Sequence, residues 1–328
     1  MIAIIKRGNV LSVILAILFV LILNYLPFTV ALDQLANGLH PNLIWDIGNF
    51  NVYPIILVLL LFIQGVILSR MMVQTQFFEQ ITYWPLAVYL MFCLNLPEQF
   101  LALNFVLYNF ILLYIYNRLF NLHEEQMQDY ELYVDIAVVF SIGLFLVPNT
   151  LLLLPLVLLM LNLFAVFDIN RFLLFLTSAA VLLINVAGLS YLFISREWTL
   201  RWWSDLTTLQ LDLTALSKPE FIATYIAIGA VLLLSIYKGF GQLRFMQTQN
   251  RKIFNMFIFQ LIFIGILFAF SGTKALGALV LMSLPLNFIV SFSSFFASRR
   301  LLTNIVILLF AFAVIFVQLV YMKNIVGL

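Results

Sequence analysis

Two aspartates and a histidine occupy a polar stretch of an otherwise apolar chain. The stretch "DQLANGLHPNLIWDIGNFNVY", residues 33–53, contains Asp33, His40 and Asp46 and has no lysine or arginine. Carboxylate and imidazole groups are capable general acids and bases, because they exchange protons with a reacting group. Acid–base chemistry is therefore conceivable here, with Asp33 or Asp46 as the base.

This stretch has two interpretations. Membrane-embedded glycosyltransferases that act on polyprenyl-linked substrates use an acidic residue just outside the first span as base or metal ligand. Asp33 follows the apolar run 10–32, but the stretch lacks an adjacent pair of acidic residues. Its "HPN" and "NFN" sequences are typical of turns. A solvated loop without a catalytic role is the simpler interpretation and the one that we expect.

The rest of the sequence offers few groups for catalysis or metal binding. It contains no H-E-x-x-H, Walker or C-x-x-C motif. His40 and His123 are expected on opposite sides of a membrane, so they cannot form one metal site. The apolar runs contain almost no ionisable residue, which argues against a proton pump. We expect no cofactor, no metal and no nucleic-acid partner, and we favour a protein that is not an enzyme.

The composition of the chain indicates that the polar residues named above are positioned by membrane helices. Of the 328 residues, 65% are hydrophobic and only 9% are charged, against about 45–50% and about 25% in soluble domains. A soluble core cannot bury so much apolar surface, so most of it must face lipid. The sequence predicts an all-α, polytopic transmembrane helix bundle. We expect one integral membrane domain, residues 1–328, with about eleven spans (range roughly nine to twelve).

Charged residues, proline and glycine separate the expected spans. The spans cover residues 10–32, 54–70, 83–97, 101–117, 133–147, 150–167, 172–194, 221–238, 253–270, 275–296 and 301–321. With a cytoplasmic N-terminus, eleven of the sixteen basic residues fall on the cytoplasmic side. This is the bias that the positive-inside rule describes, so it predicts the orientation of the bundle.

A polar segment with three tryptophans interrupts the apolar runs at residues 195–220. Its apolar residues recur every three or four positions, which predicts a periplasmic, interfacial amphipathic helix over 196–218. We expect Arg201 and Asp205 to face water and Trp198 and Trp202 to be buried. The expected contacts with lipid or a partner are Trp198, Trp202, Trp203, Leu206, Leu209 and Leu213. The simpler interpretation of this helix is a linker that pins two spans. The functional alternatives are a lid or rim over an outward-facing cavity and a docking face for another envelope protein.

An acidic cytoplasmic segment is expected at residues 118–132. A short surface helix is one interpretation. Because anionic lipid repels its acidic residues, such a helix would lie away from the membrane or bind a basic partner. A solvated linker is the simpler one.

The stretch "SLPLNFIVSFSSFFAS", residues 283–298, places a proline inside a predicted span. Pro285 leaves a carbonyl free, which serine or asparagine side chains can satisfy. This predicts an irregular helix or a cavity at Pro285, Asn287 and Ser291, although local helix packing explains the pattern equally well. The other amides inside the spans, such as Asn109 and Gln260, are expected to form interhelical hydrogen bonds.

The order of these features resembles an uncharacterised family of multispanning inner-membrane proteins from Bacteroidota. The resemblance rests on "NRLFNL", "LVPNTLLLLPLVLLMLNLF", the tryptophan-bearing segment and "LMSLPLNFIVSFSSFFASRR". It implies a multi-pass protein of the bacterial inner membrane and no catalytic residues.

The leading functional hypothesis is therefore a non-catalytic component of a cell-envelope assembly, in contact with membrane lipid and other envelope membrane proteins. One alternative is a polyprenyl-linked glycosyltransferase-like enzyme with Asp33 or Asp46 as base. The other is a carrier for a neutral or lipidic solute, with an amide-lined crevice around Asn287. The sequence does not define an oligomeric state.

Overall fold

Every regular element in the described part of the chain is a helix. The computed structural model describes residues 53–78, 82–93, 103–121, 129–164, 168–193, 196–207, 219–244, 246–270, 275–296 and Phe312. The helices are α4 (Tyr53–Gln74), α5 (Trp84–Cys93), α6 (Leu103–Phe120), α7 (Asp129–Leu146), the 3-10 helix η2 (Pro148–Leu153), α8 (Leu154–Phe164), α9 (Ile169–Phe193), α10 (Arg196–Thr207), α11 (Pro219–Leu243), α12 (Thr248–Phe270) and α13 (Ala275–Phe296). The predicted all-helical class is confirmed for these residues.

Nine of the eleven predicted spans coincide with a described helix or with the pair η2–α8. The other two, residues 10–32 and 301–321, lie outside the described residues apart from Phe312. Four described helices are long and apolar enough to cross a membrane, at Ile56–Gln74, Leu103–Phe120, Ile169–Leu192 and Thr248–Phe270. The chain thus has the helices of a membrane protein, and the number of spans stays a prediction.

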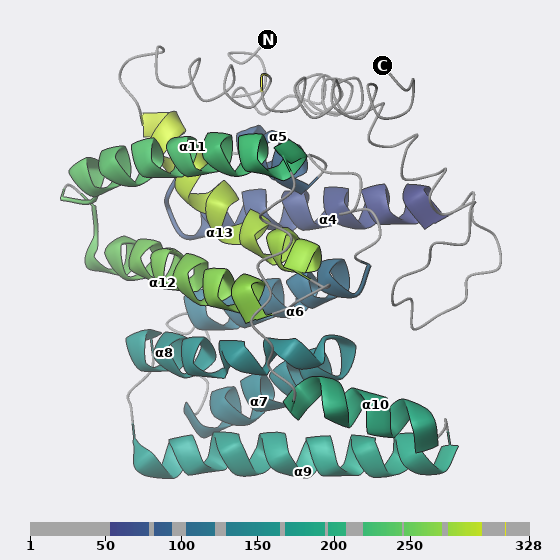
Figure 1. Cartoon of the computed structure of the whole chain (residues 1–328). Coiled ribbons are helices and arrows are strands. Elements are labelled where there is room, and N and C mark those ends of the chain that lie inside the picture. Colours follow the sequence, from purple (N-terminus) through teal and green to yellow (C-terminus); the bar gives the residue numbers. More distant parts are fainter. Residues whose placement is uncertain are drawn as a thin grey trace, which may run out of the picture.

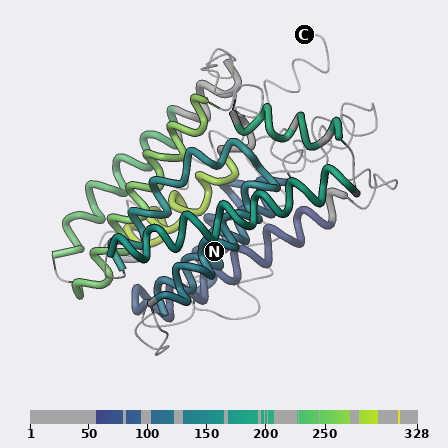
Figure 2. The backbone as a smooth tube through the Cα atoms, turned by 90° about the horizontal axis from the view of Figure 1, so that it is seen from below, coloured from purple at the N-terminus to yellow at the C-terminus, as the bar shows by residue number. Residues whose placement is uncertain are grey.

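The helices lie side by side with roughly parallel axes, as the two views in Figures 1 and 2 show. α13 lies between α11 and α12 on one side and α5 and α6 on the other, and it contacts all of them. α9 forms the edge of the bundle farthest from α11, where it packs on α7 and α10.

Helix α13 is enclosed by its neighbours along most of its length. Between Leu279 and Ser294 every side chain except Met282 is buried. Phe288 packs against Phe77 and Phe257, with ring centroids 4.7 and 4.1 Å apart. Packing of this kind drives helix association in lipid, where the hydrophobic effect between helices is lost. α13 is therefore the central helix of the described bundle.

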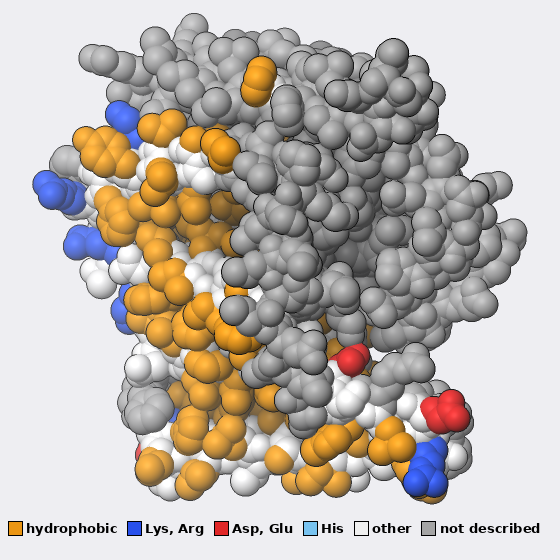
Figure 3. Space-filling model, viewed as in Figure 1, with side chains coloured by type: hydrophobic (Ala, Val, Ile, Leu, Met, Phe, Trp, Pro, Cys, Tyr) orange, Lys and Arg blue, Asp and Glu red, His pale blue; other side chains and the backbone are white. Residues whose placement is uncertain are grey.

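Basic residues gather at one end of the bundle. The C-terminal ends of α4, α6 and α11 and the N-terminal ends of α9 and α12 lie on the left in Figure 1. These ends carry Arg70, Arg118, Arg171, Lys238, Arg244, Arg251 and Lys252. Figure 3 shows Lys and Arg side chains at this edge of an apolar face. All seven belong to the set that the sequence assigns to the cytoplasm, and the orientation itself stays a prediction.

Candidate functional site

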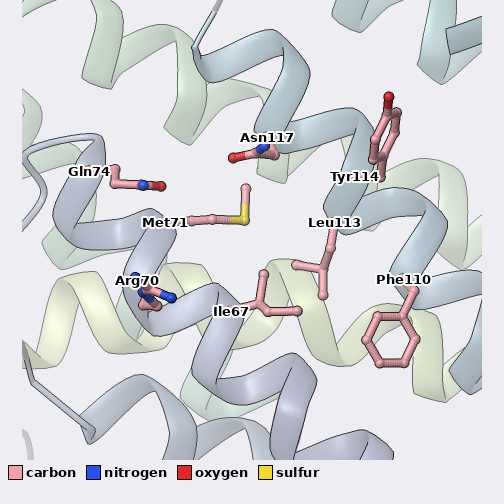
Figure 4. A pocket seen from close by; sticks show the side chains of 8 residues that line it. All are labelled: Ile67, Arg70, Met71, Gln74, Phe110, Leu113, Tyr114 and Asn117. Carbon is pink, nitrogen blue, oxygen red and sulfur yellow. The ribbon is translucent and has the colours of Figure 1, made fainter. Parts of the chain in front are cut away.

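A groove lies between α4 and α6 and ends at the basic side of the bundle (Figure 4). Its volume is about 450 Å³. The lining side chains are Ile67, Arg70, Met71 and Gln74 of α4 and Phe110, Leu113, Tyr114 and Asn117 of α6. On both helices these positions follow the spacing i, i+3, i+4, i+7, which places them on one face of each helix. The face of α4 forms one wall of the groove and the face of α6 forms the other.

The groove changes from apolar to polar along its length. α4 and α6 run in the same direction, and the first lining residue of each, Ile67 and Phe110, is apolar. The last ones, Gln74 and Asn117, carry amides. A molecule that fits this gradient is amphipathic, because its apolar part gains contact deep in the bundle and its polar part lies near the end.

Arg70 supplies the positive charge of the groove. Its side chain is exposed and lines the groove one turn before Gln74. The ion pair between the helices α6 and α7 joins Arg118 and Asp135, and within the described ranges it does not involve Arg70. The guanidinium is thus positioned to bind an anionic oxygen with its planar fork of N–H groups.

Tyr114 is held on the opposite wall by an ion-paired cluster. Its hydroxyl donates to Oδ2 of Asp135 over 2.8 Å, and Arg118 Nε donates to the same oxygen over 2.8 Å. Asp135 therefore compensates the charge of Arg118 and fixes the position of Tyr114 beside the groove. Among the described residues that line the groove, Arg70 is the one with a charged side chain.

A buried polar network joins α4 to α6 deep in the bundle. Gln64 Nε2 donates to the carbonyl of Val106 over 2.6 Å, and Tyr89 Oη donates to Gln64 Oε1 over 2.6 Å. Asn109 Nδ2 donates to Tyr89 Oη over 3.1 Å and to the carbonyl of Val280 in α13 over 3.0 Å. The network sets the relative positions of the two helices that form the groove.

Close helix contact supports the same arrangement. A Cβ added to Gly65 would lie 2.4 Å from Cδ1 of Leu86 and 3.4 Å from its Cα. Glycine thus lets α5 pack directly on α4, as small residues do in membrane helix pairs. This contact brings Tyr89 within reach of Gln64.

A second, smaller pocket continues the groove at the end of α4, and we call it the amide pocket. Its polar lining consists of Gln74, Thr75, Gln76, Asn121, Gln247 and Gln249. Phe120 also lines it, and its volume is about 110 Å³. None of these described lining residues is charged. Gln74 belongs to both pockets, so they adjoin.

Weak interactions between amides link the walls of the amide pocket. Gln247 Nε2 donates to Gln76 Oε1 and Gln249 Nε2 donates to the carbonyl of Phe120, both over 3.4 Å. Asn121 Nδ2 donates to Asn117 Oδ1 over 3.1 Å. At 3.4 Å the first two bonds are long, so both glutamines can exchange them for a ligand.

The acidic loop proposed from the sequence is not part of this site. Asp33, His40 and Asp46 lie outside the described residues, and so do Leu209 and Leu213. Within the described ranges no group of three or more His, Cys, Asp or Glu is placed to hold a metal ion.

The proline-containing stretch of α13 is buried and remains helical through Pro285. Asn287 and Ser291 are fully buried, and Ser291 Oγ donates to Asn287 Oδ1 over 2.8 Å. The Ser283 hydroxyl donates to the carbonyl of Val280. Neither the groove nor the amide pocket is lined by these residues.

The tryptophan-rich segment is helical over α10, and residues 208–218 lie outside the described part. Trp202, an expected contact with lipid or a partner, is buried within the bundle, where its Nε1 donates to the carbonyl of Leu144 in α7 over 3.1 Å. Trp203 is 56% exposed, Leu206 is half-buried, and the side chain of Trp198 is not described. Trp202 thus anchors α10 to the bundle, and Trp203 is the ring available to lipid or a partner.

The residues of the groove were not predicted as a site from the sequence. Arg70 is one of the eleven basic residues that predict the orientation, and Gln64 was not among the expected interhelical amides. Two signals were present: Gln64 interrupts the apolar run "IILVLLLFIQGVIL", and glutamines cluster at 74–76 and 247–249.

No protein-family model, curated protein or solved structure matches this chain. The resemblance to an inner-membrane family therefore stays a prediction.

Proposed function

We propose that this protein binds a phosphate-bearing lipid in the groove between α4 and α6 and acts without bond-forming chemistry, as a lipid carrier or lipid-binding membrane component. The observation that carries the proposal is the gradient of the groove, from Ile67 and Phe110 to Arg70 and Gln74. A lipid molecule has the same arrangement, with an apolar chain at one end and a polar headgroup at the other.

The apolar part of the groove suits a hydrocarbon chain. Met71 and Leu113 are buried in its wall, and a methionine side chain adapts to ligands of irregular shape. A chain bound there would lie along the helix axes, as lipids do beside membrane helices.

Arg70 suits a phosphate. A guanidinium binds phosphate oxygens with two parallel hydrogen bonds, which a lysine cannot do. The other cations at this end of the bundle add a general attraction for anionic lipid, worth about 1 kcal/mol for each residue near the surface. The specific contact is thus expected from Arg70 and the general attraction from Arg251, Lys252 and their neighbours.

The test is lipid retention by the full-length protein, purified in mild detergent and measured by native mass spectrometry. Phosphatidylmethanol, which carries one negative charge, is compared with phosphatidylcholine of the same acyl chains. We expect the wild type to prefer phosphatidylmethanol. Arg70→Gln should lose more than about tenfold in affinity for it, because a hydrogen bond to a charged group contributes about 1.5–3 kcal/mol, whereas loss of general attraction alone costs about fivefold or less. Lys252→Gln is the matched control, because Lys252 is exposed at the same end but lies outside the groove. Equal loss in both variants, or none in either, would contradict the proposal.

Two hypotheses from the sequence, the glycosyltransferase and the envelope assembly, concern features outside the groove and are tested separately. Normal complementation by both Asp33→Asn and Asp46→Asn would exclude the glycosyltransferase. Elution of the chain alone in mild detergent would argue against an envelope assembly.

A further inference from the structure

The amide pocket has the chemistry of a site for an uncharged group that carries hydroxyls. Glutamine and asparagine side chains each present one acceptor and two N–H donors, so they bind a hydroxyl in either role. None of the described residues that line the pocket is a carboxylate or a cation, and these residues therefore offer an ionic headgroup no counter-charge.

The position of the pocket relates it to the phosphate site. Gln74 follows Arg70 by one helical turn, which is a rise of about 6 Å along α4. A group attached to a phosphate on Arg70 therefore reaches Gln74, the residue that the groove and the pocket share. The volume of about 110 Å³ equals roughly three to four waters at about 30 Å³ each. A small polyol can replace such waters with its own hydroxyls.

Gln76 shows a backbone conformation that glycine would adopt more easily. Its φ angle is 58°, in the left-handed region that non-glycine residues rarely enter. It ends α4 in a Schellman motif, with bonds from its own N–H to Val73 and from the Phe77 N–H to Met72, 2.9 and 3.0 Å long.

This position normally belongs to glycine, sometimes to asparagine. The side chain of Gln76 lines the amide pocket and contacts Gln247. A strained residue whose side chain reaches into a pocket is a reason to infer function at that side chain.

We infer that the amide pocket binds the uncharged, hydroxyl-bearing headgroup of the phospholipid whose phosphate binds Arg70, with glycerol as the representative headgroup. This rests on the proposed function and adds the class of lipid. Gln76, just after α4, and Gln247, just before α12, hydrogen-bond the headgroup hydroxyls.

The experiment compares phosphatidylglycerol with phosphatidylmethanol of identical acyl chains, again on the full-length protein. The two lipids have the same charge, and the glycerol headgroup adds two carbons, each of which carries a hydroxyl group. We expect the wild type to bind phosphatidylglycerol about fivefold more tightly, the effect of one net hydrogen bond.

Two variants assign this preference to the pocket. Gln76→Gly is expected to abolish the preference, to leave phosphatidylmethanol binding unchanged and to keep or raise the melting temperature, because glycine relieves the strain. Gln247→Ala is also expected to abolish the preference for phosphatidylglycerol, because it removes the other amide that binds the headgroup hydroxyls. Asn255→Ala is the control, because Asn255 is an exposed amide of α12 outside the pocket.

The outcomes separate the two proposals. Equal wild-type affinity for both lipids, or a preference that survives in both pocket variants, overturns the headgroup inference while phosphate binding still depends on Arg70. If binding of both lipids is indifferent to Arg70→Gln, the proposed function itself fails. A lower melting temperature of Gln76→Gly together with an intact preference would show that Gln76 has only a structural role.

Discussion

The hydroxyl of Tyr89 donates a 2.6 Å hydrogen bond to Gln64, and both side chains are fully buried where α4, α5 and α6 meet. The second amide atom of Gln64 bonds the backbone of α6 at Val106. Two side chains thus connect three helices. In a membrane such bonds contribute to helix association, because lipid offers polar groups no other partner.

Replacement of Tyr89 by phenylalanine should destabilise the protein. The change leaves Gln64 Oε1 without its donor and Asn109 Nδ2 without one of its acceptors. We expect the free energy of unfolding in detergent to fall by about 1–3 kcal/mol, the cost of buried polar groups left unsatisfied. Tyr237→Phe is the control, because Tyr237 is 76% exposed. Similar stability of both variants would show that the network contributes little.

Two glycines should respond to alanine in opposite ways. At Gly65 the added methyl group would meet Leu86 at 2.4 Å, whereas at Gly265 it would have no neighbour within 4 Å. Gly65→Ala should therefore lower stability by about 1–3 kcal/mol through overpacking. Gly265→Ala, inside α12, should raise it by up to about 1 kcal/mol through helix propensity. Melting temperatures of the two variants in one detergent give the comparison. Stabilisation by both would mean that α4 and α5 separate easily.

Loss of the carboxylate of Asp135 should have a modest effect that depends on salt. Asp135→Asn removes the ion pair with Arg118, whose partners are 21% and 30% exposed. We expect a loss of about 0.5–1 kcal/mol at low salt and less at high salt. Chemical unfolding at two salt concentrations measures it. Glu131→Gln, one turn earlier on the exposed face of α7, should change stability less. A salt-independent loss would show that hydrogen bonding to Tyr114 dominates.

The two adjacent tryptophans should differ in both stability and fluorescence. Trp202→Phe removes the donor to the Leu144 carbonyl and should cost about 1–3 kcal/mol. Trp203→Phe should cost little, because that ring is 56% exposed. A quencher carried on lipid chains or dissolved in water should reduce the emission of Trp203 and spare Trp202. Equal quenching of both would show that α10 is detached from α7 in the membrane.

The sequence predicted the positions of the helices well, because long apolar runs have few other structures in lipid. The ends were less accurate. The second predicted span stopped at Arg70, but α4 continues to Gln74. An arginine near the end of a span does not break the helix, because its long side chain carries the charge to the interface.

The site was harder to predict, because it depends on which helices pack together. The bond from Gln64 to Val106 joins residues 42 positions apart, and the one from Gln247 to Gln76 spans 171 positions. Amphipathic periodicity placed Trp202 on the apolar face of its helix, but its partner Leu144 lies on α7, with η2, α8 and α9 between α7 and α10 in the chain. Periodicity identifies the buried face of a helix and does not identify what covers it.

The central place of α13 has a consequence for the order of synthesis. A chain leaves the ribosome from its N-terminus at about 5–20 residues per second, so α4 to α12 enter the membrane before the helix around which they pack. Until α13 is inserted, Trp84 lacks its hydrogen-bond partner Ser294, and Asn109 lacks the carbonyl of Val280. We expect a chain that ends at residue 274 to be degraded in cells while the full-length protein is stable, which a pulse-chase measurement would show. Assembly of this bundle is therefore completed late, when one of the last helices is inserted among those already made.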